Sequence, residues 1–135
     1  MGMILAIDPG ACSGFAYFAD TRLVSCGVFG ERPSAANVHL VVIERPQVYV
    51  KREVDLNDLV TLGIFVGRLT EFYSGCDVEH VLPREWKGQM PKDISWARSQ
   101  SKLSADEMRI VPVLAKTTVH NMRDAIGIGL WKCGR

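Results

Sequence analysis

The sequence predicts one α/β domain, and three observations support that prediction. Short, nearly all-apolar runs that suit strands covered on both faces occur at Met3–Asp8 and Val38–Ile43. A later segment, Asp55–Phe72, places apolar residues at roughly helical spacing. With 135 residues and 47% hydrophobic composition, the chain is long enough to bury one core but short for two. We therefore expect residues 1–135 to form a single domain.

The N-terminal half predicts a hairpin that continues from a central strand. Pro9 and Gly10 break the first apolar run after Asp8, and the segments Gly14–Phe18 and Leu23–Val28 then flank a short polar link. Three antiparallel strands in a row are the expected result.

The next strand ends at an acid. Val38–Ile43 is followed by Glu44, Arg45 and Pro46. Proline has no N–H to donate to a sheet, so it stops the strand there. Glu44 is therefore expected at the edge or rim of the sheet.

The C-terminal half predicts helices around one more strand. Asp55 or Asn57 is available to cap the helix that runs to Phe72. Ser104 and Glu107 have the spacing of a capping box. The remaining expectations are a strand at Val78–Leu82, a loop at Pro83–Pro91, a helix at Ser104–Val111, and a last helix that Thr117 or Thr118 caps and that runs to about Trp131.

Composition restricts the partners and the compartment. The formal net charge is +1, so any attraction to a polyanion has to come from local clusters of basic residues. The 4 cysteines are too scattered for a zinc site, and we expect reduced thiols. No basic leader precedes a cleavable apolar run, and no apolar run approaches the roughly 20 residues of a membrane helix. We expect a cytoplasmic protein with no membrane contact.

Three acids stand where the expected elements would bring them together. Asp8 and Glu44 each end an apolar strand, and Asp124 lies about one turn into the last helix. Carboxylate oxygens are the ligands that Mg²⁺ prefers, and two such ions about 4 Å apart suit hydrolysis of a phosphodiester. His120 and Asn121 precede Asp124 by four and three residues, so both share its helix face.

Each acid also has an ordinary structural explanation when it is taken alone. Asp8 before Pro-Gly is typical of a turn, Glu44 beside Arg45 suits a solvated ion pair, and His120 or Asn121 suits a helix cap. The ordered combination is what favours a metal site.

The residues carry a resemblance to a known family. Three stretches resemble, in order, the acidic motifs of the RuvC-type Holliday junction resolvases of the ribonuclease H-like superfamily, and two further stretches resemble a helix segment and a lysine-bearing loop of that family. The acidic stretches are ILAIDPGACSGFAYF, LVVIERPQVY and VHNMRDAIGIGLW, and the others are TLGIFVGRL and PREWKGQMPK. The resemblance implies a ribonuclease H-like fold, which is a five-stranded mixed sheet flanked by helices. It also implies a homodimer with two Mg²⁺ ions, for which Mn²⁺ may substitute, that resolves four-way DNA junctions by paired cuts leaving 5′ phosphates.

By the same resemblance, Asp8 corresponds to the bridging metal ligand, Glu44 to the second acid and Asp124 to the C-terminal acid. The family commonly has an acid or a histidine three residues before the last aspartate, where this chain has Asn121, with His120 one residue earlier. Either residue is a candidate fourth ligand, and His120 is slightly favoured. The chain is shorter than cellular resolvases, and a phage-encoded member acting in the host cytoplasm would have this size.

Basic and aromatic residues predict contacts with branched DNA. The segment Arg84–Lys102 has five basic and two acidic side chains, a net charge of +3, and contains Trp86 and Trp96. Basic side chains neutralise phosphates, and indoles stack on unpaired bases or pack in the core. Resolvases of this type use an aromatic after the second acid to open the junction, and Tyr49 stands there, although it is equally consistent with a strand-edge tyrosine. The candidate DNA contacts are Tyr49, Lys51, Arg52, Arg84, Lys87 and Lys92.

Other functions remain open from the sequence. A YqgF-type nuclease acting on RNA precursors shares the first aspartate and a similar length. A catalytically silent nucleic-acid-binding module and a fragment of the sugar-kinase fold are further alternatives, although the chain lacks a convincing phosphate-binding glycine loop. Gly63 and Gly67 predict close approach of another element to their helix, which would be either a dimer contact or the sheet.

Overall fold

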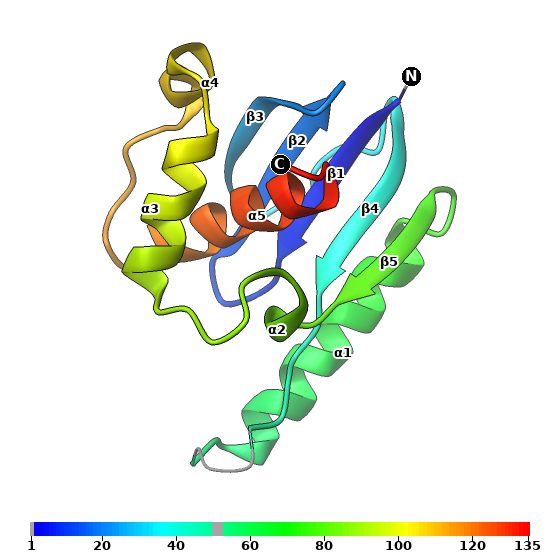
Figure 1. Cartoon of the computed structure of the whole chain (residues 1–135). Coiled ribbons are helices and arrows are strands. Elements are labelled where there is room, and N and C mark those ends of the chain that lie inside the picture. The colour runs from blue at the N-terminus through cyan, green and yellow to red at the C-terminus, as the bar shows by residue number, and fades with distance from the viewer. Residues whose placement is uncertain (1, 50–52) are drawn as a thin grey trace.

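A five-stranded mixed sheet forms the centre of the molecule in the computed structural model, which describes residues 2–49 and 53–135 (Figure 1). Its order is β3-β2-β1-β4-β5. β1 is antiparallel to β2 and parallel to β4, β2 is antiparallel to β3, and β4 is parallel to β5. The strands are β1 (Met3–Asp8), β2 (Ser13–Ala19), β3 (Arg22–Phe29), β4 (Val38–Glu44) and β5 (Asp77–Val81). The fold class and the N-terminal hairpin are therefore confirmed.

Strand register places two of the acids on one face. Ile7 of β1 pairs with Ile43 of β4, so Asp8 and Glu44 each follow a paired residue at the same end of two parallel strands. Alternate residues of a strand face opposite sides of the sheet. Asp8 therefore shares its face with Ala6, and Glu44 shares it with Val42.

One face of the sheet carries α1 (Leu56–Phe72) and the other carries α5 (Val119–Lys132) (Figure 1). The α1 side buries Leu69 and Tyr73 against alternate strand residues such as Leu5 and Ile7. The α5 side includes Ile128 packed with Ala6 and Val42. The face that holds Asp8 and Glu44 is therefore the face that α5 covers.

Two glycines let α5 lie close to the sheet. A Cβ at Gly14 of β2 would overlap the backbone of Asn121, and a Cβ at Gly129 of α5 would overlap the ring of Phe18. Close packing thus compensates for the low helix propensity of glycine in α5. The approach fixes where the first turns of α5, and hence Asp124, stand relative to β1 and β2.

Most predicted helix starts are confirmed. Asp55 accepts a hydrogen bond from the Asn57 N–H at 2.9 Å and caps α1. Ser104 and Glu107 form the expected capping box of α4 (Ala105–Ile110). Thr118 occupies the N-cap position of α5, but its hydroxyl donates to the Ala115 carbonyl, so a capping side chain there was wrongly predicted.

The segment between β5 and α4 is more helical than the sequence indicated. The expected loop Pro83–Pro91 begins with a short helix, α2 (Pro83–Trp86), with proline at its first position, where the missing N–H costs nothing. α3 (Lys92–Lys102) was not predicted at all. It buries only Ser95 and Ser99, so it has no apolar periodicity to reveal it.

Of the two alternatives for the glycines of α1, a dimer contact or packing against the sheet, the structure excludes packing against the sheet. A Cβ at Gly63 or Gly67 would meet no atom within 4 Å, so both glycines lie on the open side of the helix. Within the described residues, no helix is both long enough and apolar enough to cross a membrane.

Candidate active site

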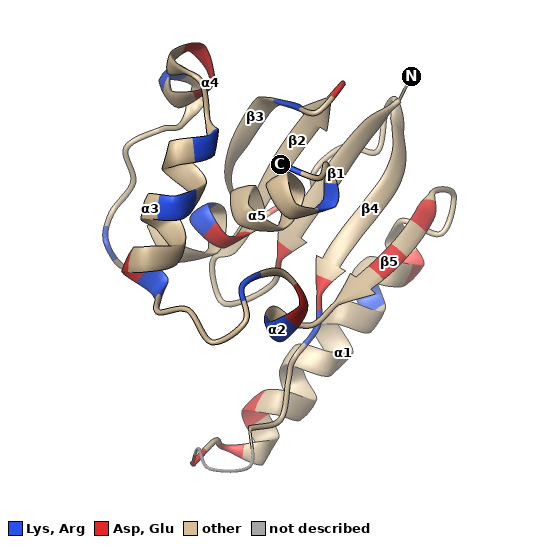
Figure 2. Cartoon of the chain, viewed as in Figure 1, with Lys and Arg blue, Asp and Glu red and all other residues tan. Residues whose placement is uncertain are grey.

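Three carboxylates gather where β1 and β4 end beneath α5. Asp8 is 5% exposed, Glu44 is half-buried, and the side chain of Asp124 is 14% exposed. Figure 2 shows acidic positions at the ends of β1 and β4 and basic positions along α3 on the neighbouring side. The strand register and the close approach of α5 thus unite side chains from three distant parts of the sequence.

The electrostatics of the cluster follow from this crowding. Burial is the main cause that raises the pKa of Asp8 well above its usual range, and the negative charges of Glu44 and Asp124 raise it further. Burial is also the main cause that raises the pKa of Glu44. The cluster therefore favours any cation that enters it.

Two neighbouring residues, Trp86 and Lys87, contact the acids, and the contact that Trp86 makes was not indicated by the sequence. The indole Nε1–H of Trp86 donates to Oε2 of Glu44 at 2.6 Å. Lys87 Nζ lies 3.5 Å from Asp124 Oδ2 and 5.1 Å from the centre of the Trp86 ring. The end of α2 and the residue after it thus supply a neutral donor to one acid and a positive charge to another.

Gly127 explains why the indole reaches the cluster. A Cβ at this position of α5 would overlap the six-membered ring of Trp86. The indole therefore lies flush against α5, with its N–H directed at Glu44. Trp96, the other tryptophan of the basic segment, instead packs under the guanidinium of Arg123 at 5.0 Å.

The donor set fits a divalent metal in its chemistry. Three carboxylates with one lysine leave excess negative charge, and all the donors are hard oxygens. Within the described residues, no three His, Cys, Asp or Glu side chains are already spaced as metal ligands. Metal binding would therefore require the carboxylate side chains to move closer together.

The two candidate fourth ligands are placed differently. Asn121 Nδ2 donates to the Cys12 carbonyl at 2.7 Å, and its amide fills the space where a Cβ of Gly10 would lie. His120 is exposed. The fourth ligand stays a prediction, but this placement favours Asn121, which contacts the turn that follows Asp8.

Four of the six predicted DNA contacts, Tyr49, Arg84, Lys87 and Lys92, lie within the described residues. Arg84 and Lys92 are exposed, and the backbone N–H of Arg84 donates to Gln47 Oε1 at 3.2 Å, which ties α2 to the segment after β4. Tyr49 is half-buried and has an interaction partner. Lys51 and Arg52 lie outside the described residues. Lys87 is paired with Asp124, so it lies at the acidic cluster itself.

Structural comparison identifies the fold. Thermus thermophilus RuvC aligns with a TM-score of 0.57 and 16% sequence identity over 95% of this chain and 91% of that chain. A structure described as T. thermophilus RuvC in complex with Holliday junction substrate aligns with a TM-score of 0.55 and 16% identity over 96% of this chain and 91% of that one. The sequence matches no protein-family model and no curated protein. The chain therefore has the ribonuclease H-like fold of RuvC.

Proposed function

We propose that the protein is a metal-dependent endonuclease that resolves four-way DNA junctions by paired hydrolysis of phosphodiesters, leaving 5′ phosphates. The observation that carries the proposal is the gathering of Asp8, Glu44 and Asp124 at one end of the sheet. The likeness over nearly the full chain to a RuvC described with Holliday junction substrate supports the choice of substrate.

Asp8, Glu44 and Asp124 would hold two Mg²⁺ or Mn²⁺ ions, with Asn121 or His120 as a further ligand. When bound, the ions would supply Lewis acidity that stabilises the negative charge developing on the phosphate. Asp8 is the most buried of these three acids and would lie at the centre of the site. Trp86 orients Glu44, because its indole donor holds one carboxylate oxygen.

Lys87 has two roles in this proposal. In the free protein its ammonium offsets part of the negative charge of Asp124. When cations neutralise the acids, Lys87 is released to contact a phosphate of the bound strand, as a flexible point charge does well. Further electrostatic contacts with DNA phosphates would come from Arg84, Lys92, Lys51 and Arg52. Tyr49 would stack on a base at the junction.

A second copy of the chain would pair on α1. Along this helix Leu56 is 70% exposed, Val60 is 61% exposed and Ile64 is 56% exposed, and Gly63 and Gly67 leave open space beside them. Spacings of four residues place the three large side chains in one stripe. A symmetric pair of such helices would bury the stripe and present two active sites to the two strands of a junction.

The decisive experiment is cleavage of a labelled synthetic four-way junction with Mg²⁺, Mn²⁺ or EDTA, beside linear duplex and RNA–DNA hybrid controls. The proposal expects symmetric, metal-dependent cuts in the junction alone, which Asp8→Asn abolishes while junction binding persists. Cleavage that survives Asp8→Asn would refute the site.

Two other results would identify the competing functions. Binding of the junction without cleavage by the wild-type protein would identify a silent module. Preference for RNA would identify an RNA-processing nuclease.

A further inference from the structure

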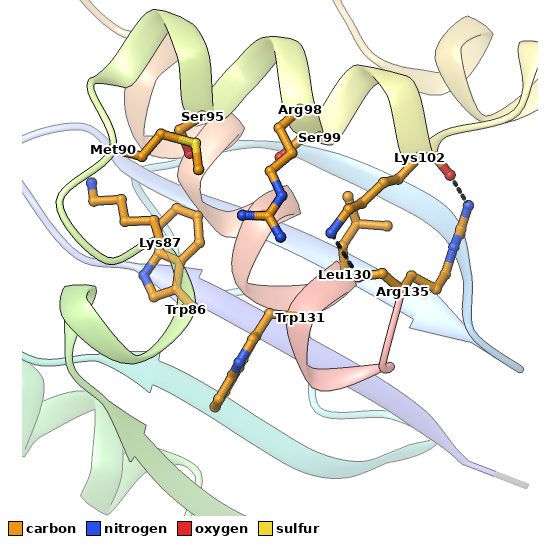
Figure 3. Close-up of a pocket in the computed structure, with 11 residues that line it drawn as sticks. Trp86, Lys87, Met90, Ser95, Arg98, Ser99, Lys102, Leu130, Trp131 and Arg135 are labelled. Carbon is orange, nitrogen blue, oxygen red and sulfur yellow. Dashed lines mark hydrogen bonds between the residues drawn. The ribbon is translucent and has the colours of Figure 1, made fainter.

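A cavity of about 100 Å³ lies beside the carboxylates, between α3 and the C-terminal half of α5 (Figure 3). This is several times the space that one water molecule needs, so a group as large as phosphate can enter. We call it the cationic pocket, and it is lined by Trp86, Lys87, Met90, Ser95, Arg98, Ser99, Lys102, Gly127, Leu130, Trp131 and Arg135.

The pocket is named for its charge. Four of its lining residues are lysine or arginine, and none is an acid. Two of the four are neutralised elsewhere, because Lys87 pairs with Asp124 and Arg135 pairs with Glu107. Across residues 2–49 and 53–135, neither Arg98 nor Lys102 has a salt bridge to an aspartate or glutamate side chain.

These two cations face the same space. Figure 3 shows the guanidinium of Arg98 directed into the pocket beside the Lys102 side chain. The Lys102 ammonium donates to the main-chain oxygen of Arg135, the last residue of the sequence, at 2.8 Å, which holds the ammonium in position. Burial lowers the pKa of Lys102, and the positive charges of Arg98 and Arg135 lower it further, as expected where cations crowd together.

The lining suits one class of anion better than others. A planar guanidinium and an ammonium that converge on one space match a tetrahedral oxyanion, which offers several oxygens to separate donors. The buried Ser95 and Ser99 lie on the same wall, so hydroxyl donors are also at hand. An anion bound there would relieve the repulsion between Arg98 and Lys102.

The pocket and the acids share a wall. Trp86 lines the pocket and donates its indole N–H to Glu44, and Lys87 lines the pocket and pairs with Asp124. A nucleic-acid strand whose phosphodiester lies at the carboxylates therefore has a neighbouring phosphate within reach of the pocket.

We propose that the cationic pocket is a phosphate-binding subsite in which Arg98 and Lys102 hold a phosphate that neighbours the phosphodiester under attack. That the phosphate belongs to a DNA strand rests on the proposed function. Free inorganic phosphate has the same chemistry and could occupy the same site. The DNA strand would then be held at two places, at the carboxylates and in the cationic pocket, with Trp86 and Lys87 between them.

The first arm of the test uses inorganic phosphate alone. Indole N–H resonances of ¹⁵N-labelled protein are followed during a phosphate titration at constant ionic strength. Trp86 and Trp131 line the pocket and are expected to shift with saturation, whereas Trp96 lies outside it and serves as an internal reference. Arg98→Gln is expected to abolish the saturable shifts.

The second arm measures junction affinity by fluorescence anisotropy at several salt concentrations, in EDTA. Arg98→Gln is expected to weaken binding several-fold and to reduce the slope of log affinity against log salt by about 1, the effect of one lost phosphate contact. The matched control is Arg22→Gln, because Arg22 is exposed and begins β3 at the end of the sheet opposite to Asp8.

The outcomes distinguish DNA phosphate from free phosphate, and they test the pocket separately from the proposed function. Lost phosphate shifts with a lower salt slope assign the pocket to DNA, and lost shifts with an unchanged slope assign it to free phosphate. An Arg98→Gln protein that matches the wild type in both arms overturns the pocket, even if the wild type cuts junctions. A wild type that binds phosphate but cuts no nucleic acid overturns the proposed function and leaves the pocket standing.

Discussion

Trp86 is the residue whose role the structure changes most. Its indole N–H is 2.6 Å from Glu44 Oε2, and its ring rests against Gly127. Trp86→Phe would keep an aromatic ring on α5 and remove the donor. Groups that orient metal ligands typically contribute 10- to 100-fold in metal affinity or activity, so we expect kcat or the Mn²⁺ affinity to fall by about 10-fold.

Metal titration and single-turnover cleavage would measure this effect, with urea denaturation to show that the fold is intact. Trp96→Phe is the matched control, because Trp96 lies outside the cationic pocket and packs under the guanidinium of Arg123. If Trp86→Phe retains both the wild-type kcat and the wild-type Mn²⁺ affinity, the indole does not position Glu44.

Ionised Asp8 lowers the free energy of unfolding, and this effect can be measured without a substrate. Burial and the charges of Glu44 and Asp124 raise its pKa, so ionised Asp8 destabilises the metal-free fold at neutral pH. We expect Asp8→Asn to raise the free energy of unfolding in EDTA by about 1 to 2 kcal/mol at pH 7. The sign follows because a carboxyl with a raised pKa loses stability as pH rises above its unfolded pKa.

Urea denaturation in EDTA at pH 7 and at pH 4 tests this. The gain of Asp8→Asn should shrink at pH 4, where Asp8 of the wild type is largely protonated. Asp20→Asn, at an exposed turn, is the control. A variant less stable than the wild type at pH 7 would contradict the electrostatic account.

At the scale of residues, the sequence was sufficient to predict that two of the acids lie close together. Asp8 and Glu44 end apolar strands, and parallel strands bring such ends together. The Trp86–Glu44 contact joins residues 42 positions apart, and it depends on how α2 packs on Gly127. No local pattern in PREW indicates that packing, so only the folded chain reveals it.

Among the elements, α1 provides the sharpest test of assembly. Its exposed stripe of Leu56, Val60 and Ile64 is the surface on which we propose that a second copy docks. Ile64→Glu would place a charge in that interface, so we expect the variant to be monomeric in sedimentation equilibrium. Thr61→Glu is the control, because Thr61 is exposed on the same helix to the side of the stripe.

Coupled cutting should follow assembly. On a supercoiled plasmid with an extruded cruciform, a dimer linearises the DNA and a monomer leaves single nicks. We expect Ile64→Glu to shift the product from linear to nicked DNA. If Ile64→Glu stays dimeric, α1 does not form the dimer interface.

Whether the sequence revealed an element depended on how the element is stabilised. α1 and α4 begin at capping side chains, and the first four strands are apolar, so all of these were predictable. α3 begins after Pro91 with no capping side chain and buries two serines, so neither signal was present. It nevertheless forms one wall of the cationic pocket.

The molecule as a whole is held by a contact that joins separate elements around one buried acid. Glu107 of α4, 3% exposed in its side chain, receives hydrogen bonds from the Leu23 N–H of β3 and from the guanidinium of Arg135 after α5. The five-stranded mixed sheet was expected only from the resemblance, because apolar runs do not specify which strands pair. The Glu107 contact was not expected at all, since its partners lie 84 and 28 positions away.

This contact predicts how the stability of the protein depends on acid. The Arg135 hydrogen bonds are the main cause that lowers the pKa of Glu107 to about 2. A carboxyl whose folded pKa is depressed stabilises the fold above its unfolded pKa and loses that contribution as pH falls toward the folded value. A pKa lowered from its ordinary value of 4.5 to about 2 corresponds to a loss of about 3 kcal/mol. We therefore expect the free energy of unfolding of the wild type to fall between about pH 4.5 and pH 2.

Urea denaturation across that range, in EDTA, compares the wild type with Glu107→Gln and with Glu71→Gln. Glu107→Gln should be less stable at pH 7 and should have a flatter dependence on acid, because the carboxylate that gains and loses protons is gone. Glu71 is exposed on α1, so Glu71→Gln should follow the wild-type curve. If Glu107→Gln keeps the wild-type slope, the acid sensitivity lies elsewhere, and the contact between β3, α4 and the end of α5 does not control the stability of the whole molecule.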